Sequence, residues 1–357
     1  MTRVMRRRDV LIGGAAITLG GGLSGCDLFA DPKRLRILGL AGAIPSRIVK
    51  AFETQFNKPT ELKTEPTPDA IWKFLKDTVE PVKVPDVASL GDAWLDLAIA
   101  QHLISPLTIT SIPQWQNLSP LWKQAVTRNG KVWGIPYRWG LTAIAYRSDK
   151  LDIPINGWAD LWRTELKGKI TLPNDPREVI GLTLKKLGYS YNTANIKAIA
   201  PLTPALQALN QQVLTYTSDS YLQPLLIGDS WLAVGWSQDI VNTAEQNSDI
   251  KVVIPAEGTA LWSDLWVFPQ RVNRPENQIF GQDWLDLCLT PAIANQITAL
   301  TDATATNPDL GKLPKSVTSN ILKFPPDQIL AKSELILPLS ETSNQEYKQL
   351  WENLRQA

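Results

Sequence analysis

The stretch KGKITLPNDPREVIG at residues 167–181 decides the fold class. Its first part, residues 169–172, is short and apolar, as one buried strand would be. The next part has the composition of a helix start, with Asp175 at the N-cap, Pro176 at the first helical position and Glu178 at the third. The helical pattern runs from residue 177 to residue 187. A strand that leads through a tight turn into a helix is the unit from which α/β proteins are built.

The same alternation continues in both directions from this stretch. Toward the N-terminus, strand patterns at 35–40, 84–90, 132–136 and 141–146 alternate with helical patterns at 45–56, 70–79 and 94–104. Toward the C-terminus, strand patterns lie at 231–235, 251–254 and 265–268, with helical patterns at 203–213, 284–289, 291–299, 327–330 and 345–355. Two α/β sets joined by extended segments predict two lobes with a cleft between them.

The first thirty residues have the order of an export signal: a basic cluster, a short apolar run and a processing site. Arg7 and Arg8 belong to the run RRDVL, which resembles the twin-arginine export signature; an ordinary basic flank for the general secretory route is the alternative. The apolar run is shorter than the roughly 20 residues of a membrane-spanning helix. LSGC at 23–26 resembles the lipoprotein box, in which the thiol of Cys26 receives a diacylglycerol. We therefore expect a periplasmic protein, anchored by this lipid to the outer face of the cytoplasmic membrane.

The composition argues against several chemistries. The only histidine, His102, is expected to be partly buried and structural, and Cys288, the one cysteine besides Cys26, to be a small buried hydrophobe. A His/Cys metal site therefore cannot be assembled, and we expect no metal and no cofactor. The net charge of +1 gives no basic footprint for nucleic acid. A carboxylate-dependent hydrolase stays open, because Asp and Glu are plentiful.

Five collinear segments resemble the spermidine/putrescine-binding proteins of bacterial ABC importers. They are residues 167–181, LGYSYN at 187–192, PYRWGLTAIAY at 136–146, AVGWSQD at 233–239 and IPAEGTALWSD at 254–264. The resemblance implies a type II periplasmic binding fold, in which two α/β lobes enclose a ligand cleft and are joined by two extended crossings. It also implies a binding protein and no enzyme, a monomer, and an ABC permease as the partner.

The resemblance also divides the chain. It places the export signal at residues 1–25 and a tether at 26–34. Lobe one would comprise residues 35–140 with 261–305, and lobe two residues 141–260 with 306–357. The crossings would lie near Gly140 and near residues 258–260.

A polyamine needs carboxylates at intervals and aromatic faces between them, because it is an apolar chain that carries separated ammonium groups. On the positions that match the family, Asp175, Glu178 and Asp264 would hold ammonium groups. Trp236 and Trp262 would pack on the methylene groups. The alternative for each is structural: Asp175 and Glu178 also make a good helix start, and any one of fourteen tryptophans is more often core than ligand wall.

The first lobe departs from the family pattern. Where the family has an aromatic residue and a hydroxyl after the first strand, this chain has GLAGA at 39–43. Asp92 and Trp94, after the next strand, are the candidates to replace them. We therefore expect lobe one to have lost much of its share of the site.

These observations predict an extracytoplasmic solute-binding lipoprotein that captures a polyamine or similar organic cation. Three alternatives stay open: a binding protein for another small solute on the same fold, a surface carboxylate-dependent hydrolase, and a sensor or assembly factor that does not transport. A wholly apolar wall on lobe one would favour the last.

Overall fold

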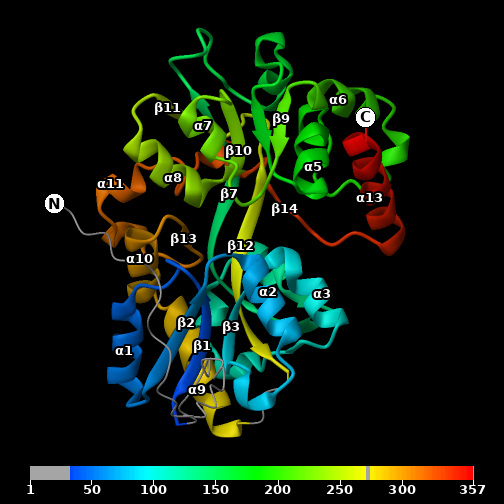
Figure 1. The fold of residues 1–357 in the computed structure, drawn as a ribbon. Coiled ribbons are helices and arrows are strands. Elements are labelled where there is room, and N and C mark those ends of the chain that lie inside the picture. Colours follow the sequence, from blue (N-terminus) through cyan, green and yellow to red (C-terminus); the bar gives the residue numbers. More distant parts are fainter. Residues whose placement is uncertain (1–32, 271–273, 357) are drawn as a thin grey trace, which may run out of the picture.

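The structure is a computed structural model that describes residues 33–270 and 274–356. Its ribbon has a lower and an upper half that meet at a narrow waist (Figure 1). Strands and helices alternate through both halves, as the sequence predicts. The predicted export signal, with Arg7, Arg8 and Cys26, lies outside the described residues. Within those residues, every helix is too short or too polar to cross a bilayer.

The lower half is built on a mixed sheet with the strand order β2-β1-β3-β12-β7. β1 runs parallel to β2 and β3, and β12 runs antiparallel to β3 and β7. All six residues of β1 are buried, as expected for a strand covered on both faces. The strands are β1 (Leu35–Leu40), β2 (Thr60–Glu65), β3 (Val87–Gly91), β4 (Ile104–Ser105), β5 (Thr127–Arg128), β6 (Lys131–Val132), β7 (Ile135–Arg147), β12 (Ala260–Pro269), β13 (Thr304–Ala305) and β14 (Glu334–Leu335).

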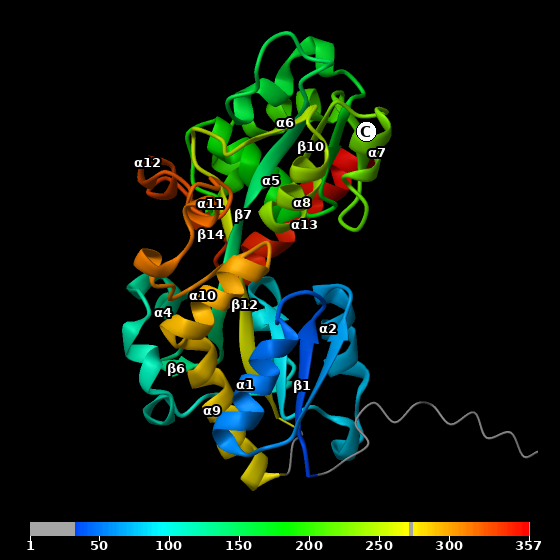
Figure 2. The same cartoon turned by 90° about the vertical axis from the view of Figure 1, so that its left-hand side faces the viewer.

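Helices cover this sheet on both faces. Figure 2 shows α1 and α9 side by side, and Phe52 of α1 packs edge-on against Trp284 of α9 with 5.4 Å between ring centroids. Cys288, on the same helix, is buried as predicted. The helices are α1 (Ser46–Phe56), α2 (Pro68–Asp77), α3 (Leu95–Ala100), α4 (Pro120–Ala125), α9 (Pro275–Leu289) and α10 (Pro291–Leu300). Two short helices, α11 (Lys315–Thr318) and α12 (Asp327–Leu330), lie above α10 beside the waist (Figure 2).

The predicted helix at residues 94–104 is shorter than expected. A 3₁₀ turn (Asp92–Trp94) precedes α3, which ends at Ala100, and the chain then enters β4. His102 lies in the connecting turn with φ 53°, in the left-handed region, and its side chain is exposed. The expectation of a partly buried histidine was therefore wrong, because the chain reverses there.

The upper half continues the sheet in the order β7-β10-β8-β9. β8 is parallel to β9 and β10, and α5 follows β8 as the sequence predicts. The strands are β8 (Ile170–Leu172), β9 (Val213–Tyr216), β10 (Leu232–Trp236) and β11 (Ile250–Val253), and the helices are α5 (Pro176–Lys186), α6 (Leu202–Asn210), α7 (Gln223–Ile227), α8 (Ser237–Gln246) and α13 (Glu341–Gln356).

β7 belongs to both halves. Its first part pairs with β12, up to Leu141 opposite Leu261, and its second part pairs with β10, from Thr142 opposite Trp236. Twelve of its thirteen residues are buried. Beside it, the hydroxyl of Thr259 donates a 2.6 Å hydrogen bond to the carbonyl of Thr142, just before β12 begins. The chain therefore passes between the halves along β7 and near the start of β12.

Two hydrophobic cores flank this passage. One fills the lower half and continues past it to Tyr221 and to Ile240 of α8. The other lies in the upper half and includes Trp158 and Tyr347 of α13. The segment after β13 returns to α10 of the lower half, where the ammonium group of Lys323 donates to the carbonyl of Thr298. The lobe boundaries given above stay a prediction.

Candidate ligand-binding cleft

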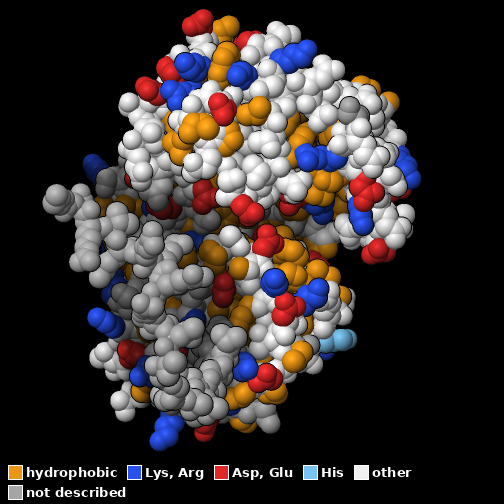
Figure 3. All heavy atoms as spheres, viewed as in Figure 1, with side chains coloured by type: hydrophobic (Ala, Val, Ile, Leu, Met, Phe, Trp, Pro, Cys, Tyr) orange, Lys and Arg blue, Asp and Glu red, His pale blue; other side chains and the backbone are white. Residues whose placement is uncertain are grey.

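The cleft is framed by the strands that connect the halves and by the turns beside them. Figure 3 shows acidic side chains gathered along the hollow where the two halves meet. On β7 and β12, Gly140 pairs with Trp262 and Arg138 with Asp264. Residues directly opposite each other in an antiparallel pair project from the same face of a sheet. Arg138, Trp262 and Asp264 therefore share one face at the waist.

The start of α5 carries two of the predicted ligand residues. Asp175 is the N-cap: its carboxylate accepts hydrogen bonds from the backbone N–H groups of Arg177 at 2.7 Å and Glu178 at 3.2 Å. Burial raises the pKa of Asp175, while those two hydrogen bonds oppose the rise. The structural role considered from the sequence is thus present, and the carboxylate stays half-buried at the cleft.

Glu178 is different, because its carboxylate is only partly satisfied. The side chain is 4% exposed, and Oε1 accepts a 3.0 Å hydrogen bond from the hydroxyl of Thr142. Oε2 is buried and has no hydrogen-bond partner among the described residues. Burial, reinforced by the charges of Asp175 and then Asp92, raises the pKa of Glu178 to about 8. A buried carboxylate oxygen without a donor is costly, and a cationic donor would satisfy it.

Asp92 faces the same region from the lower half. Its Oδ2 accepts hydrogen bonds from the backbone N–H of Ser263 at 3.0 Å and from the Ser263 hydroxyl at 3.3 Å. Burial, with a smaller contribution from the charge of Asp264, raises the pKa of Asp92 to about 7. The charge of Asp92 contributes to the raised pKa of Glu178. Because Asp92 follows β3 in the lower half and Glu178 lies on α5 in the upper half, this effect acts between the two halves.

Aromatic side chains border these acids on both sides. In the lower half, Trp94 is half-buried and stacks on Trp72 of α2, with ring centroids 4.8 Å apart and planes 10° from parallel. In the upper half, Trp236 packs edge-on against Tyr221 at 5.5 Å. The stack of Trp94 on Trp72 places two indoles side by side in the lower half.

Trp262 lies across the passage between the halves. A Cβ on Gly140 would be 2.1 Å from its Cζ2 atom and 2.6 Å from the hydroxyl of Ser237 at the start of α8, so only glycine fits there. The indole is half-buried, and its Nε1 has no hydrogen-bond partner among the described residues. The indole therefore covers the backbone of β7 and presents an unused donor.

Asp264 has a partner that the sequence analysis did not foresee. The Nε and Nη2 atoms of Arg138 both lie 2.6 Å from its Oδ2. Arg138 is 3% exposed and Asp264 5%. Burial is the largest single effect and lowers the pKa of Arg138, but the charges of Asp264 and Tyr137, together with the hydrogen bonds to them, outweigh it and the pKa is raised. The carboxylate predicted to meet an ammonium group is thus already paired with a guanidinium group.

Two further acids were missed. Partial loss of hydration raises the pKa of Asp69 at the start of α2, and the charges of Asp219 and Asp175 add to the rise. Asp69 belongs to the lower half, whereas Asp219 and Asp175 belong to the upper half, and Figure 1 shows α2 and α5 on opposite sides of the waist. The signal for Asp69 was present in the sequence, since TPD at 67–69 is a capped helix start like that of α5.

These effects order the acids into a series, which we call the acidic series. In each pair of neighbours in it, the charge of one acid raises the pKa of the other. Both halves contribute acids to it. In order, the series is Asp264, Asp92, Glu178, Asp175, Asp69 and Asp219.

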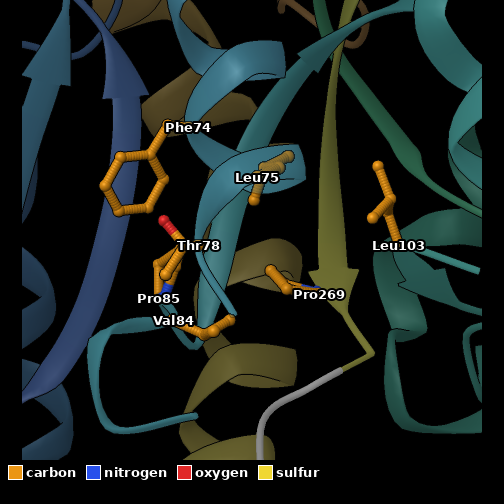
Figure 4. A pocket seen from close by; sticks show the side chains of 7 residues that line it. All are labelled: Phe74, Leu75, Thr78, Val84, Pro85, Leu103 and Pro269. Carbon is orange, nitrogen blue, oxygen red and sulfur yellow. The ribbon is translucent and has the colours of Figure 1, made fainter. Parts of the chain in front are cut away.

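Two other hollows lie away from the acidic series. One is a groove beside α13, lined mainly by polar side chains such as Gln345 and Asn353. The other is a small apolar pocket near the end of β12 that is remote from the waist (Figure 4). Neither contains a residue of the series. The small pocket is lined by Phe74, Leu75, Thr78, Val84, Pro85, Leu103 and Pro269.

Residues 47–323 match the family of bacterial extracellular solute-binding proteins, and the chain belongs to that family. It is 28% identical over 289 residues to the spermidine/putrescine-binding periplasmic protein of Salmonella typhimurium, covering 78% of this chain and 81% of that protein. It is 29% identical over 251 residues to the protein of the same name from Escherichia coli, covering 68% and 70%.

Among solved structures, a spermidine/putrescine ABC transporter substrate-binding protein from Streptococcus pneumoniae superposes with a TM-score of 0.80. The match covers 91% of this chain and 99% of that one at 23% identity, which establishes the fold. The predicted type II periplasmic binding fold and the predicted family resemblance are therefore confirmed. The chain is a binding protein and not an enzyme, as the family implies.

Proposed function

We propose that this chain captures an organic cation, foremost a polyamine, outside the cytoplasmic membrane and delivers it to an ABC permease. The observation that carries the proposal is the unpaired carboxylate oxygen of Glu178, buried within a series of acids drawn from both halves. An ammonium group would supply the missing donor and would relieve the repulsion that raises the pKa values of Glu178 and Asp92. The names of the curated relatives support the same class of ligand.

Each part of the cleft has a role in this proposal. The carboxylates of Glu178, Asp175, Asp92 and Asp69 would hold ammonium groups by charge-assisted hydrogen bonds. The indoles of Trp94, Trp236 and Trp262 would pack on the methylene groups, with cation–π contacts of about 0.5–2 kcal/mol each. Movement of the halves toward each other would remove water and strengthen every one of these interactions.

The other candidate functions are less well supported. A lower-half wall that includes Asp69 and Asp92 is not apolar, which argues against a sensor without a ligand. Raised pKa values in cleft acids are also a feature of hydrolases, but here burial and neighbouring acids account for them, and a bound cation would reverse them. The remaining alternative is that the same fold binds a different small solute. Titration with neutral solutes tests this alternative.

Calorimetry tests the proposal directly. The full chain, purified in detergent, is titrated with putrescine, spermidine and spermine, and with neutral diols of matched length. We expect saturable binding of at least one amine and none of the diols. Absence of binding to every amine would overturn the polyamine assignment, and binding of a neutral solute in their place would favour the alternative.

The proposal includes the anchor and the lobes. Lipid on Cys26 would hold the receptor at high local concentration beside its permease, and Arg7 and Arg8 would direct export. Residues 35–140 with 261–305, and 141–260 with 306–357, would move as the two lobes. Cys26→Ser should release the protein from the membrane fraction into the soluble fraction; retention in the membrane would contradict the lipid anchor.

A further inference from the structure

The ion pair between Arg138 and Asp264 lies inside the proposed site and not behind it. Both side chains project from the face of β7 and β12 that carries Trp262, which is a proposed wall of the cleft. Asp264 is also the first member of the acidic series, since its charge raises the pKa of Asp92. Arg138 therefore supplies a fixed positive charge at one end of a site that otherwise consists of carboxylates.

This positive charge is held firmly in place. Two nitrogens of the guanidinium group contact one oxygen of Asp264 at 2.6 Å, and both side chains are almost fully buried. Burial raises the pKa of Asp239 on α8, and the charge of Arg138 is one of the effects that oppose this rise, so the guanidinium group acts on acids of both halves. Asp239 is itself occupied, because its carboxylate accepts a 2.8 Å hydrogen bond from the hydroxyl of Tyr221.

Unlike Asp264, Glu178 has no cationic partner in the part of the chain that the structure describes. It is as deeply buried as Asp264, but one of its carboxylate oxygens has no partner among the described residues. Within the described residues, Glu178 thus offers an acceptor that has no cation beside it, whereas a guanidinium group already contacts Oδ2 of Asp264. An ammonium group near Asp264 would face the guanidinium group, and like charges at short range repel strongly in a site with little water.

We propose that Arg138 takes the place of one ligand ammonium group at Asp264, and that it makes the cleft selective for diamines over triamines. The inference rests on the proposed function and narrows it. The two ends of a diamine can be held by the part of the series from Asp92 to Asp69. The additional ammonium group of a triamine finds its position at Asp264 occupied by a charge of the same sign.

The test compares the dissociation constants of putrescine, a diamine, and spermidine, a triamine, for the full chain in detergent. The native chain should bind putrescine at least about tenfold more tightly. Arg138→Gln frees the carboxylate of Asp264 and should lower the ratio of the spermidine to the putrescine constant by about tenfold or more. Arg147→Gln is the matched control: Arg147 is on the same strand but pairs with Asp149 outside the site, and the ratio should not change.

A second variant guards against misfolding of the first. Arg138→Gln with Asp264→Asn leaves no buried charge without a partner, and it removes the repulsion without freeing a carboxylate. It should lower the ratio by less than Arg138→Gln alone. Equal binding of both amines by the native chain would overturn the inference, as would a ratio that neither variant changes. Failure of every amine to bind would instead overturn the proposed function.

Discussion

Glu178 in the upper half and Asp264 in the lower half are both buried carboxylates at the cleft, but their surroundings are opposite. Asp264 has its countercharge within the protein, from Arg138. Glu178 has only the hydroxyl of Thr142 and the repulsion of neighbouring acids. The first arrangement favours the stability of the fold. The second is unfavourable until a ligand arrives, which is how a binding site differs from a core.

Removal of the paired carboxylate should have the largest effect. Asp264→Asn leaves the guanidinium group of Arg138 buried without a countercharge, so we expect the free energy of unfolding to fall by about 3 kcal/mol. Denaturant unfolding measures it. The control is Asp149→Asn, which removes the partner of Arg147 at the surface and should have a much smaller effect. Similar losses in the two variants would contradict the contrast between a buried pair and an exposed one.

The unpaired carboxylate should behave in the reverse way. Glu178→Gln should weaken amine binding by roughly 1.5–3 kcal/mol, the scale of a hydrogen bond to a charged group. The free energy of unfolding at pH 7 should not fall, because a pKa of about 8 leaves Glu178 mostly uncharged in the empty protein, and glutamine is also uncharged. Calorimetry and denaturant unfolding of the same preparation measure both quantities. Glu352→Gln, on the exposed face of α13, is the control; loss of stability without loss of affinity in Glu178→Gln would mark Glu178 as structural.

The smallest expected effect is the release of protons when an amine binds. With pKa values of about 8 for Glu178 and about 7 for Asp92, the empty cleft holds protons near neutral pH that a bound cation displaces. Amine binding at pH 7 should therefore release about one proton. Affinity should rise as the pH increases from about 6 to about 8, where the carboxylates ionise. Calorimetry in two buffers with different ionisation enthalpies counts the protons.

The stability of the empty protein should depend on pH in the opposite direction to amine affinity. The pKa of Glu178 is raised from 4.5 in the unfolded chain, so the folded protein binds more protons between that value and about 8. The stability contribution of Glu178 is therefore complete at low pH and is lost as the pH rises through 8. If amine affinity and the free energy of unfolding changed in the same direction with pH, the raised pKa of Glu178 would be contradicted.

Local patterns allowed much of the fold to be predicted from the sequence. The turn at Asp175 and Pro176 specifies a capped helix start by itself, and α5 begins at Pro176 as expected. The burial of β1 follows from its mainly apolar sequence, and its one charged residue, Arg36, is buried with it and donates to the carbonyl of Val82. At residue 102 the prediction failed, because the apolar pattern of 94–104 does not distinguish a helix from a helix followed by a turn and a strand.

The site was predicted less completely, because its contacts join residues from segments that are far apart in the sequence. The pairing of Arg138 with Asp264 depends on the register of β7 against β12, which no single segment reveals. Asp69 is a plain helix start until α2 and α5 are seen on opposite sides of the waist. In the lower half, Asp92 was a candidate from the sequence because it directly follows β3, whereas Asp69 lies in a segment that the family resemblance does not mark.

The place of β12 in the sheet also bears on how the chain folds. In the lower half this strand lies between β3 and β7, yet it comes from residues 260–269, long after both of its neighbours. While the ribosome has made only the first half of the chain, β3 has no partner on that side, and β7 has none of the strands with which it pairs, because all of them come after residue 231. Contacts between such distant segments close late and slowly. The lower half therefore cannot complete its sheet until three quarters of the chain has been synthesised.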